Sequence, residues 1–168
     1  MEPGTPAVTL APPRIVSGKP MLLAGLRQRY SSTTMNEIPQ LWYRFAPHIG
    51  NVAAQVGWVA YGAVIPIENG AQGFDYICAV EVSQRSGLPA GFSTLDVPAL
   101  RYAVFTHPGH VSRLRETIET IWRKWLPESG RQAAERSGDT PGMIERYGEG
   151  FDPQAGLGDI ELWIPIEA

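Results

Sequence analysis

The chain has 168 residues, of which 43% are apolar and 18% charged, and its net charge is −3. This composition allows one compact domain with a buried core. Lys and Arg form no basic stripe, which disfavours direct nucleic-acid binding, because neutralising phosphates requires clustered cations. The single cysteine, Cys78, excludes an intramolecular disulfide and a zinc site built from several cysteines. We expect no metal site and no cofactor.

The N-terminal half predicts one β-α-β-β unit. Residues 1–13 contain four prolines and are expected to form a flexible, extended tail without the features of a signal peptide. Residues 14–30 favour β-strand with a break near Pro20. The helical spacing of Leu41, Trp42 and Phe45 then predicts a helix that ends near Pro47. A hairpin follows, with strands at 58–66 and 74–82 and a turn at 68–73.

The same order of elements then repeats. Residues 92–109 are extended and interrupted at Pro98. The clearest helix follows at 110–127, with Ser112 as its expected N-cap. One apolar stripe on that helix is expected to face the core, and it consists of Leu114, Ile118, Ile121, Trp122 and Trp125. A strand is predicted within 143–149, and the last strand is DIELWIPI, residues 159–166.

These patterns predict a single α+β domain at 14–168, built from a duplicated β-α-β-β module with pseudo-twofold symmetry. Repeat one covers about 14–82 and repeat two about 92–166. Residues 75–82 align with 159–166 without a gap. The repeats can join their antiparallel sheets edge to edge, with both helices on one side, which leaves the other face free for a groove.

The terminal strand has two different faces, because side chains alternate along a strand. One face is aliphatic and is expected to pack on the helices. The other carries Glu161 and Trp163, where the first repeat has Ile77 and Ala79. A partly desolvated carboxylate beside an aromatic ring favours a cationic ligand. The alternative is that Glu161 simply faces solvent.

Other chemically suggestive residues have simpler interpretations. His107 and His110 form an H-x-x-H pattern, but a third metal ligand is lacking, so a role in the turn and the helix cap is favoured. Cys78 lies within an apolar run and is expected to be a core residue. No run of apolar residues approaches the ~18 residues that cross a membrane. We therefore expect a cytoplasmic protein.

The paired β-α-β-β order resembles GyrI-like proteins, the effector-binding domain of AraC-type and MerR-type multidrug regulators in bacteria. The specific matches are the segment PALRYAVFTHPGHVSRLRETIETIWRKWLPESG, the following IERY and FDP, and the terminal GDIELWIPI. The resemblance extends from about Arg14 to Ile166. Because no helix-turn-helix segment precedes Arg14, we expect a stand-alone member rather than a complete regulator of transcription.

The resemblance implies curved antiparallel sheets, two helices packed behind them and a central cleft for hydrophobic, planar or cationic small molecules. It implies a carboxylate at the bottom of the cleft, and Glu161 occupies that motif position. The aromatic and acidic residues that it implies around this carboxylate are Trp163, Tyr147, Tyr102, Tyr61 and Glu145.

Three functions stay open at this point. The first is binding of multidrug-like effectors for sensing or sequestration. The second is hydrolysis of cyclopropane-bearing or related electrophilic toxins, in which Glu161 and Tyr147 would be catalytic. The third is modulation of a protein partner such as DNA gyrase. Membrane association and direct contact with nucleic acid are not expected.

Overall fold

The computed structural model describes residues 9–67, 73–135 and 138–167. The elements follow in the order β1 (Arg14–Ser17), β2 (Met21–Tyr30), α1 (Ile38–Phe45), β3 (Gln55–Pro66), β4 (Phe74–Val82), β5 (Ser93–Val97), β6 (Arg101–Thr106), α2 (Leu114–Thr120), α3 (Leu126–Ser129), β7 (Met143–Tyr147) and β8 (Ile160–Ile166). A π-helical turn at Ile121–Trp125 joins α2 to α3. Most of the predicted tail and of the predicted turn at 68–73 lies outside the described residues.

All eight strands belong to one antiparallel sheet, in the order β1-β6-β8-β7-β3-β4-β2-β5. The two repeats meet at β3 and β7 in the middle of the sheet. The first strand of each repeat crosses to the other half, so that β1 pairs with β6 and β5 pairs with β2. The predicted α+β fold with a duplicated module is confirmed, and the exchange of first strands is an additional feature.

The pseudo-twofold axis passes through the centre of the sheet. When residues 75–82 are matched to 159–166, the strand registers place the pair Gly62 and Glu145 on this axis. A glycine and a glutamate therefore face each other where the two repeats meet. At this point the backbone follows the pseudo-twofold symmetry, but the side chains do not.

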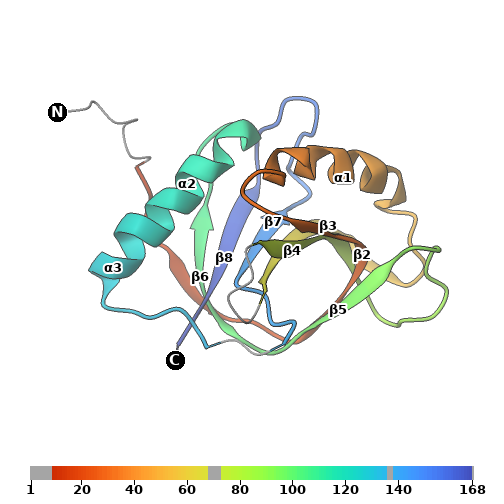
Figure 1. The fold of residues 1–168 in the computed structure, drawn as a ribbon, viewed down its shortest axis with the longest axis horizontal. Helices are drawn as coiled ribbons and strands as arrows, with labels where there is room; N and C mark the ends of the chain where they lie inside the picture. The colour runs from red at the N-terminus through yellow and green to blue at the C-terminus, as the bar shows by residue number, and fades with distance from the viewer. Residues whose placement is uncertain (1–8, 68–72, 136–137, 168) are drawn as a thin grey trace.

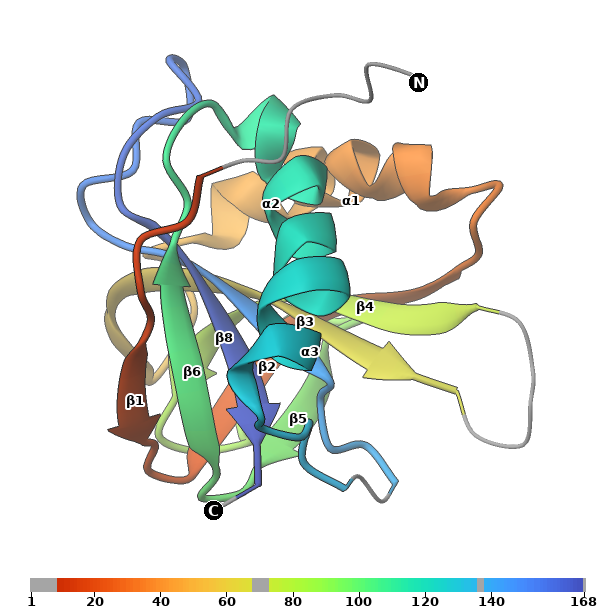
Figure 2. The same ribbon diagram turned by 90° about the vertical axis from the view of Figure 1, so that its left-hand side faces the viewer.

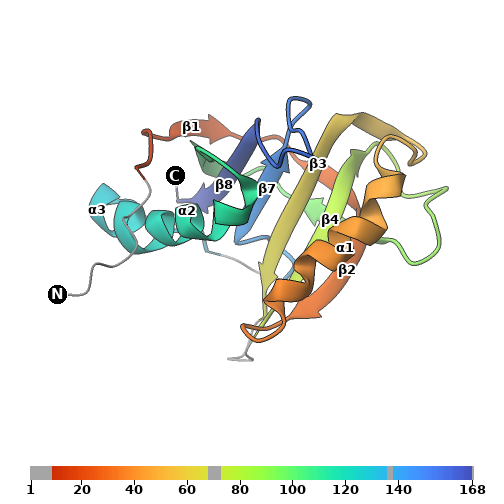
Figure 3. The same ribbon diagram turned by 90° about the horizontal axis from the view of Figure 1, so that it is seen from above.

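One face of the sheet is covered by α1 and by a second helical arm, which consists of α2, the π-helical turn and α3. This arrangement of the helices on one side was predicted (Figure 1). Leu41 and Phe45 of α1 pack with the side chains of β4 that face them. The aliphatic face of β8 packs against Leu114 and Ile121 of the second helical arm. Figure 2 shows α2 and α3 running alongside β6 and β8, and Figure 3 shows α1 in front of the strands of the first repeat, with α2 and α3 next to β8.

The other face of the sheet is closed rather than open. The sheet curves strongly, and the loops after β1 and β5 meet in a hydrogen bond from Gly18 N to Leu100 O of 2.7 Å. The enclosed side chains are almost completely buried, and they are Leu23, Ala63, Ile77, Ala79, Leu95, Val97, Tyr102, Val104 and Ile144. The strands' own side chains therefore occupy much of the face on which a groove was predicted.

Candidate functional site

The structure divides the six predicted site residues between the two faces of the sheet. Glu161, Trp163, Tyr102 and Tyr61 belong to the closed face, whereas Glu145 and Tyr147 belong to the helix-covered face. The separation follows from register, because Arg146 lies directly opposite Glu161 in the β7–β8 pair, and its neighbours Glu145 and Tyr147 must point the other way. Alternation along one strand does not reveal which residue of the neighbouring strand lies opposite, so it could not predict this separation.

Glu161 is already neutralised by neighbouring cations. Its Oε2 accepts a hydrogen bond from Arg14 Nη1 at 3.0 Å, and its Oε1 accepts from Trp163 Nε1 at 3.2 Å. Arg146 Nη1 lies 3.4 Å from the same Oε1. With two arginines and an indole N–H around it, this carboxylate retains little attraction for a cationic ligand.

The tyrosines on the closed face act mainly in packing. Tyr102 is 1% exposed, and its ring meets that of Trp163 edge-to-face at 5.1 Å between centroids. Its hydroxyl has no hydrogen-bond partner among the described residues, and burial raises its pKa to about 12. Tyr61 is half-buried, and burial also raises its pKa. The Glu161 cluster thus lies beside a packed core.

Glu145 lies at the centre of a buried hydrogen-bond chain on the other face. Tyr76 Oη donates to Glu145 Oε1 at 2.7 Å, and Tyr147 Oη donates to the same oxygen at 2.9 Å. Trp42 Nε1 of α1 donates in turn to Tyr76 Oη at 2.9 Å. The chain links α1, β4 and β7 through one carboxylate oxygen.

The carboxylate of Glu145 has no cationic partner among the described residues, although it is only 8% exposed. Burial raises its pKa, and the hydrogen bonds from Tyr76 and Tyr147 lower it in part. Burial, together with the nearby Glu145 charge, raises the pKa of both tyrosines well above the ordinary value. No hydrogen bond to Oε2 is found in the described part of the chain, so this oxygen is the one left for a ligand.

Gly62 provides the space for this arrangement. A Cβ atom at this position would overlap the hydroxyl of Tyr76 and lie 2.8 Å from Glu145 Oε1. Only a residue without a side chain leaves room for the two groups to meet in front of β3. The glycine opposite Glu145 on the pseudo-twofold axis is therefore part of the site.

Half-buried apolar side chains surround the Glu145 network. The Trp42 ring meets that of Tyr147 edge-to-face at 5.3 Å, and the Phe151 ring lies 5.1 Å from Tyr147. The partly exposed hydrophobic residues that pack against the same cluster include Trp42, Ile49, Val64, Trp122 and Phe151. An anion with aromatic walls is the arrangement that attracts hydrophobic cations.

Sequence reasoning missed Tyr76 and used Trp42 as part of the helical spacing, not as a site residue. A tyrosine on the helix-facing side of an otherwise apolar strand was the available signal for Tyr76, because a buried phenol needs a hydrogen-bond partner. The identity of that partner depends on which strand lies beside which. The sequence alone does not specify it.

The remaining polar features have structural roles. His107 is buried, and its ring nitrogens contact Thr117 Oγ1 at 2.8 Å and His110 O at 2.7 Å. The side chain of His110 caps the helical arm by accepting from Ser112 N, so the cap is His110 and not Ser112. The preference for turn and cap roles over a metal site agrees with these contacts.

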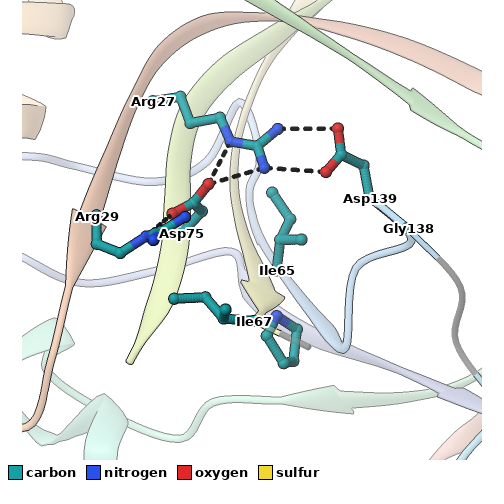
Figure 4. A pocket seen from close by; sticks show the side chains of 8 residues that line it. Arg27, Arg29, Ile65, Ile67, Asp75, Gly138 and Asp139 are labelled. Atoms are coloured by element: carbon teal, nitrogen blue, oxygen red, sulfur yellow. Dashed lines mark hydrogen bonds and ion pairs between the residues drawn. The ribbon is translucent and has the colours of Figure 1, made fainter. Parts of the chain in front are cut away.

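A separate hollow of about 230 Å³ lies at one end of the closed face (Figure 4). Arg27 is held by both oxygens of Asp139 at 3.0 and 3.1 Å and also contacts Asp75. Arg29 pairs with the other oxygen of Asp75 at 2.7 Å. These four charges compensate one another, so each charged side chain described in the lining of this hollow already has a partner of opposite charge.

Comparison with known proteins agrees with the fold. Transcriptional regulator BrlR of Pseudomonas aeruginosa is 31% identical over 155 residues, which cover 91% of this chain and 54% of BrlR. The chain thus spans about half the length of this curated relative. None of the helices in the described residues is long and apolar enough to cross a membrane.

Solved structures share the fold at low sequence identity. The structure of SAV2435 bound to tetraphenylphosphonium has a TM-score of 0.72 and 17% identity, with 93% of this chain and 94% of that one covered. An integron cassette protein from the mobile metagenome of Vibrio cholerae has a TM-score of 0.65 and 17% identity, with 94% and 97% covered. The family model for Cass2, described as integron-associated effector binding protein, matches residues 14–166. The chain therefore belongs to this family of effector-binding proteins, within the GyrI-like group.

Proposed function

We propose that this chain binds hydrophobic aromatic cations, and that Glu145 is the carboxylate that receives the positive charge. The observation that carries the proposal is that Glu145 is buried without a cationic partner among the described residues. Glu161, in contrast, contacts Arg14 and Arg146. A ligand cation would replace the missing counter-charge at Glu145, where low polarity strengthens the attraction.

The two oxygens of Glu145 have different roles in this proposal. Tyr76 and Tyr147 fix the carboxylate through Oε1, so that Oε2 remains for the ligand. The rings of Trp42 and Tyr147 provide aromatic faces and edges beside the charge. A delocalised cation with apolar substituents matches these contacts, because its weak hydration makes it inexpensive to desolvate.

The comparisons support the same class of ligand. SAV2435, which has a similar fold, was solved with tetraphenylphosphonium, a monovalent cation with four aromatic rings. BrlR is a transcriptional regulator, and the matched part is about half of it. We infer that this chain serves as an effector-binding unit, for sensing or for sequestration.

Hydrolysis is less well supported as the function of this site. Tyr147 contacts the Glu145 carboxylate, and such a pair can serve as acid and base. The raised pKa of Tyr147 makes it a weak proton donor near neutral pH, however. Binding without turnover therefore fits the geometry better.

Titration calorimetry with tetraphenylphosphonium and with its neutral analogue triphenylphosphine oxide tests the proposal. Glu145→Gln keeps the shape of the side chain and removes its charge. We expect it to weaken binding of the cation by at least about tenfold, or ~1.4 kcal/mol, and binding of the neutral analogue by less than about twofold. An equal loss for the two probes would show that the charge of Glu145 is not used.

A further inference from the structure

Trp58 is exposed beside the proposed binding site. Its side chain is 64% exposed, although indole is among the larger apolar groups that a protein usually buries. It lies on β3, two residues before Ala60, which is opposite Tyr147 in the β3–β7 pair. Gly62, beside Glu145, lies two residues further along the same strand.

The exposure of Trp58 results from a bulge in β3. The pairing of β3 with β4 is interrupted between Gln55 and Ala60, and Gly57 within this interval has a φ of 69°. Bulges of this kind redirect side chains and occur often beside functional sites. The pairing with β7 also ends at Ala60, so residues 56–59 have no strand partner among the described residues.

The bulge is held in place by specific contacts. The Gln55 side chain accepts from Gly50 N and donates to Gly57 O, each at 2.9 Å. The Trp58 ring rests against Gly50, where a Cβ atom would lie only 2.6 Å from the ring. Gly50 itself has a φ of 85°, which favours glycine. The structure thus positions Trp58 rather than leaving it in a loose loop.

These contacts place Trp58 on the helix-covered side of the sheet. Gly50 follows α1, and the preceding Ile49 packs against both hydrophobic clusters on that side. Ala60 belongs to the same cluster as Tyr147. Trp58 therefore lies on the same side of the sheet as the aromatic residues around Glu145.

We propose that Trp58 forms an outer aromatic subsite, which selects elongated polyaromatic cations over compact ones. This inference rests on the proposed function and adds the shape of the ligand to its charge. Along β3, a regular rise of ~3.3 Å per residue sets an upper limit of roughly 13 Å on the separation of Trp58 and Gly62. A cationic centre at Glu145 therefore needs an extended aromatic arm to stack on Trp58.

Two phosphonium probes with the same charge test this subsite. Tetraphenylphosphonium is compact, and biphenylyl-triphenylphosphonium carries one additional ring on one arm. For Trp58→Ala we expect about 3–10-fold weaker binding of the biphenylyl probe, the range for one aromatic contact, and less than about twofold for tetraphenylphosphonium. Trp58→Phe should restore most of the affinity for the longer probe.

Tyr43→Ala is the matched control, because Tyr43 on α1 is an aromatic residue that is 86% exposed. It should change neither affinity. Unchanged binding of both probes in Trp58→Ala, or an equal loss for both, would overturn the subsite. Glu145→Gln should weaken both probes to the same extent. A further outcome is that Glu145→Gln leaves the binding of both probes unchanged while Trp58→Ala still weakens binding of the longer probe. In that case Glu145 does not receive the cation, but the aromatic subsite at Trp58 is supported.

Discussion

The carboxyl group of Glu145 lies in a place where a negative charge is costly. Two tyrosine hydroxyls stabilise its Oε1, but the described residues supply no cation, and burial remains the main influence on its pKa. Replacing a buried, uncompensated charge by a neutral group of similar shape often stabilises a protein. We interpret this carboxylate as a residue kept for binding at some expense of stability.

A pH series of thermal melting tests this interpretation. Because the pKa of Glu145 is raised above its ordinary value of 4.5 in the folded state, its contribution to stability is fully present below pH ~4.5. That contribution is lost as the pH rises through the folded-state pKa. Glutamine does not titrate, so Glu145→Gln should not lose stability as the pH rises. The variant should therefore match the wild type near pH 4 and melt higher near pH 8.

We expect a gain of roughly 2–4 °C near pH 8, which corresponds to ~1 kcal/mol for a chain of this size. Glu167→Gln, which removes a carboxylate at an exposed position near the C-terminus, is the control and should melt like the wild type. A difference between Glu145→Gln and the wild type that is constant across the pH range would contradict the interpretation.

The elements themselves were largely predictable from the sequence, because they depend on local patterns. The predicted strand 74–82 has the same bounds as β4, and the breaks near Pro20 and Pro98 separate β1 from β2 and β5 from β6. Contacts between elements were not predictable in the same way. Tyr76, Trp42 and Glu145 come together only through the order and register of β4, β3 and β7.

His107 stabilises the connection between β6 and the second helical arm. Its backbone N–H donates to Ile160 O at 2.9 Å, and its ring holds Thr117 and the carbonyl of His110. His107→Phe keeps a ring of similar size but leaves the buried Thr117 hydroxyl and the His110 carbonyl without these partners. We expect a loss of about 2–4 kcal/mol in the free energy of unfolding, measured by urea denaturation.

His48→Phe serves as the control for this prediction. The ring of His48 is half-buried against Phe45 and Phe92, and no side-chain hydrogen bond to it is found among the described residues. The change should alter stability by less than about 1 kcal/mol. If both substitutions lower the free energy of unfolding by the same amount, the hydrogen bonds of His107 do not contribute to stability.

At the scale of the whole molecule, the duplicated backbone is symmetric and the site is not. Glu145 meets Gly62 across the pseudo-twofold axis, so the centre of the sheet carries one carboxylate instead of two. The closed face shows the same asymmetry, since Glu161 and Trp163 correspond to Ile77 and Ala79. Comparing the repeats in the sequence therefore identified Glu161 as unusual, but it did not show that Arg14 and Arg146 neutralise it.

The most direct test of the account compares the two carboxylates in one experiment. Tetraphenylphosphonium is titrated into the wild type, Glu145→Gln and Glu161→Gln at low ionic strength, and dissociation constants are measured by calorimetry. If Glu145 receives the cation, Glu145→Gln should weaken binding by at least about tenfold and Glu161→Gln by less than about twofold. A large loss in Glu161→Gln with unchanged affinity in Glu145→Gln would contradict the account and assign the cation to the closed face.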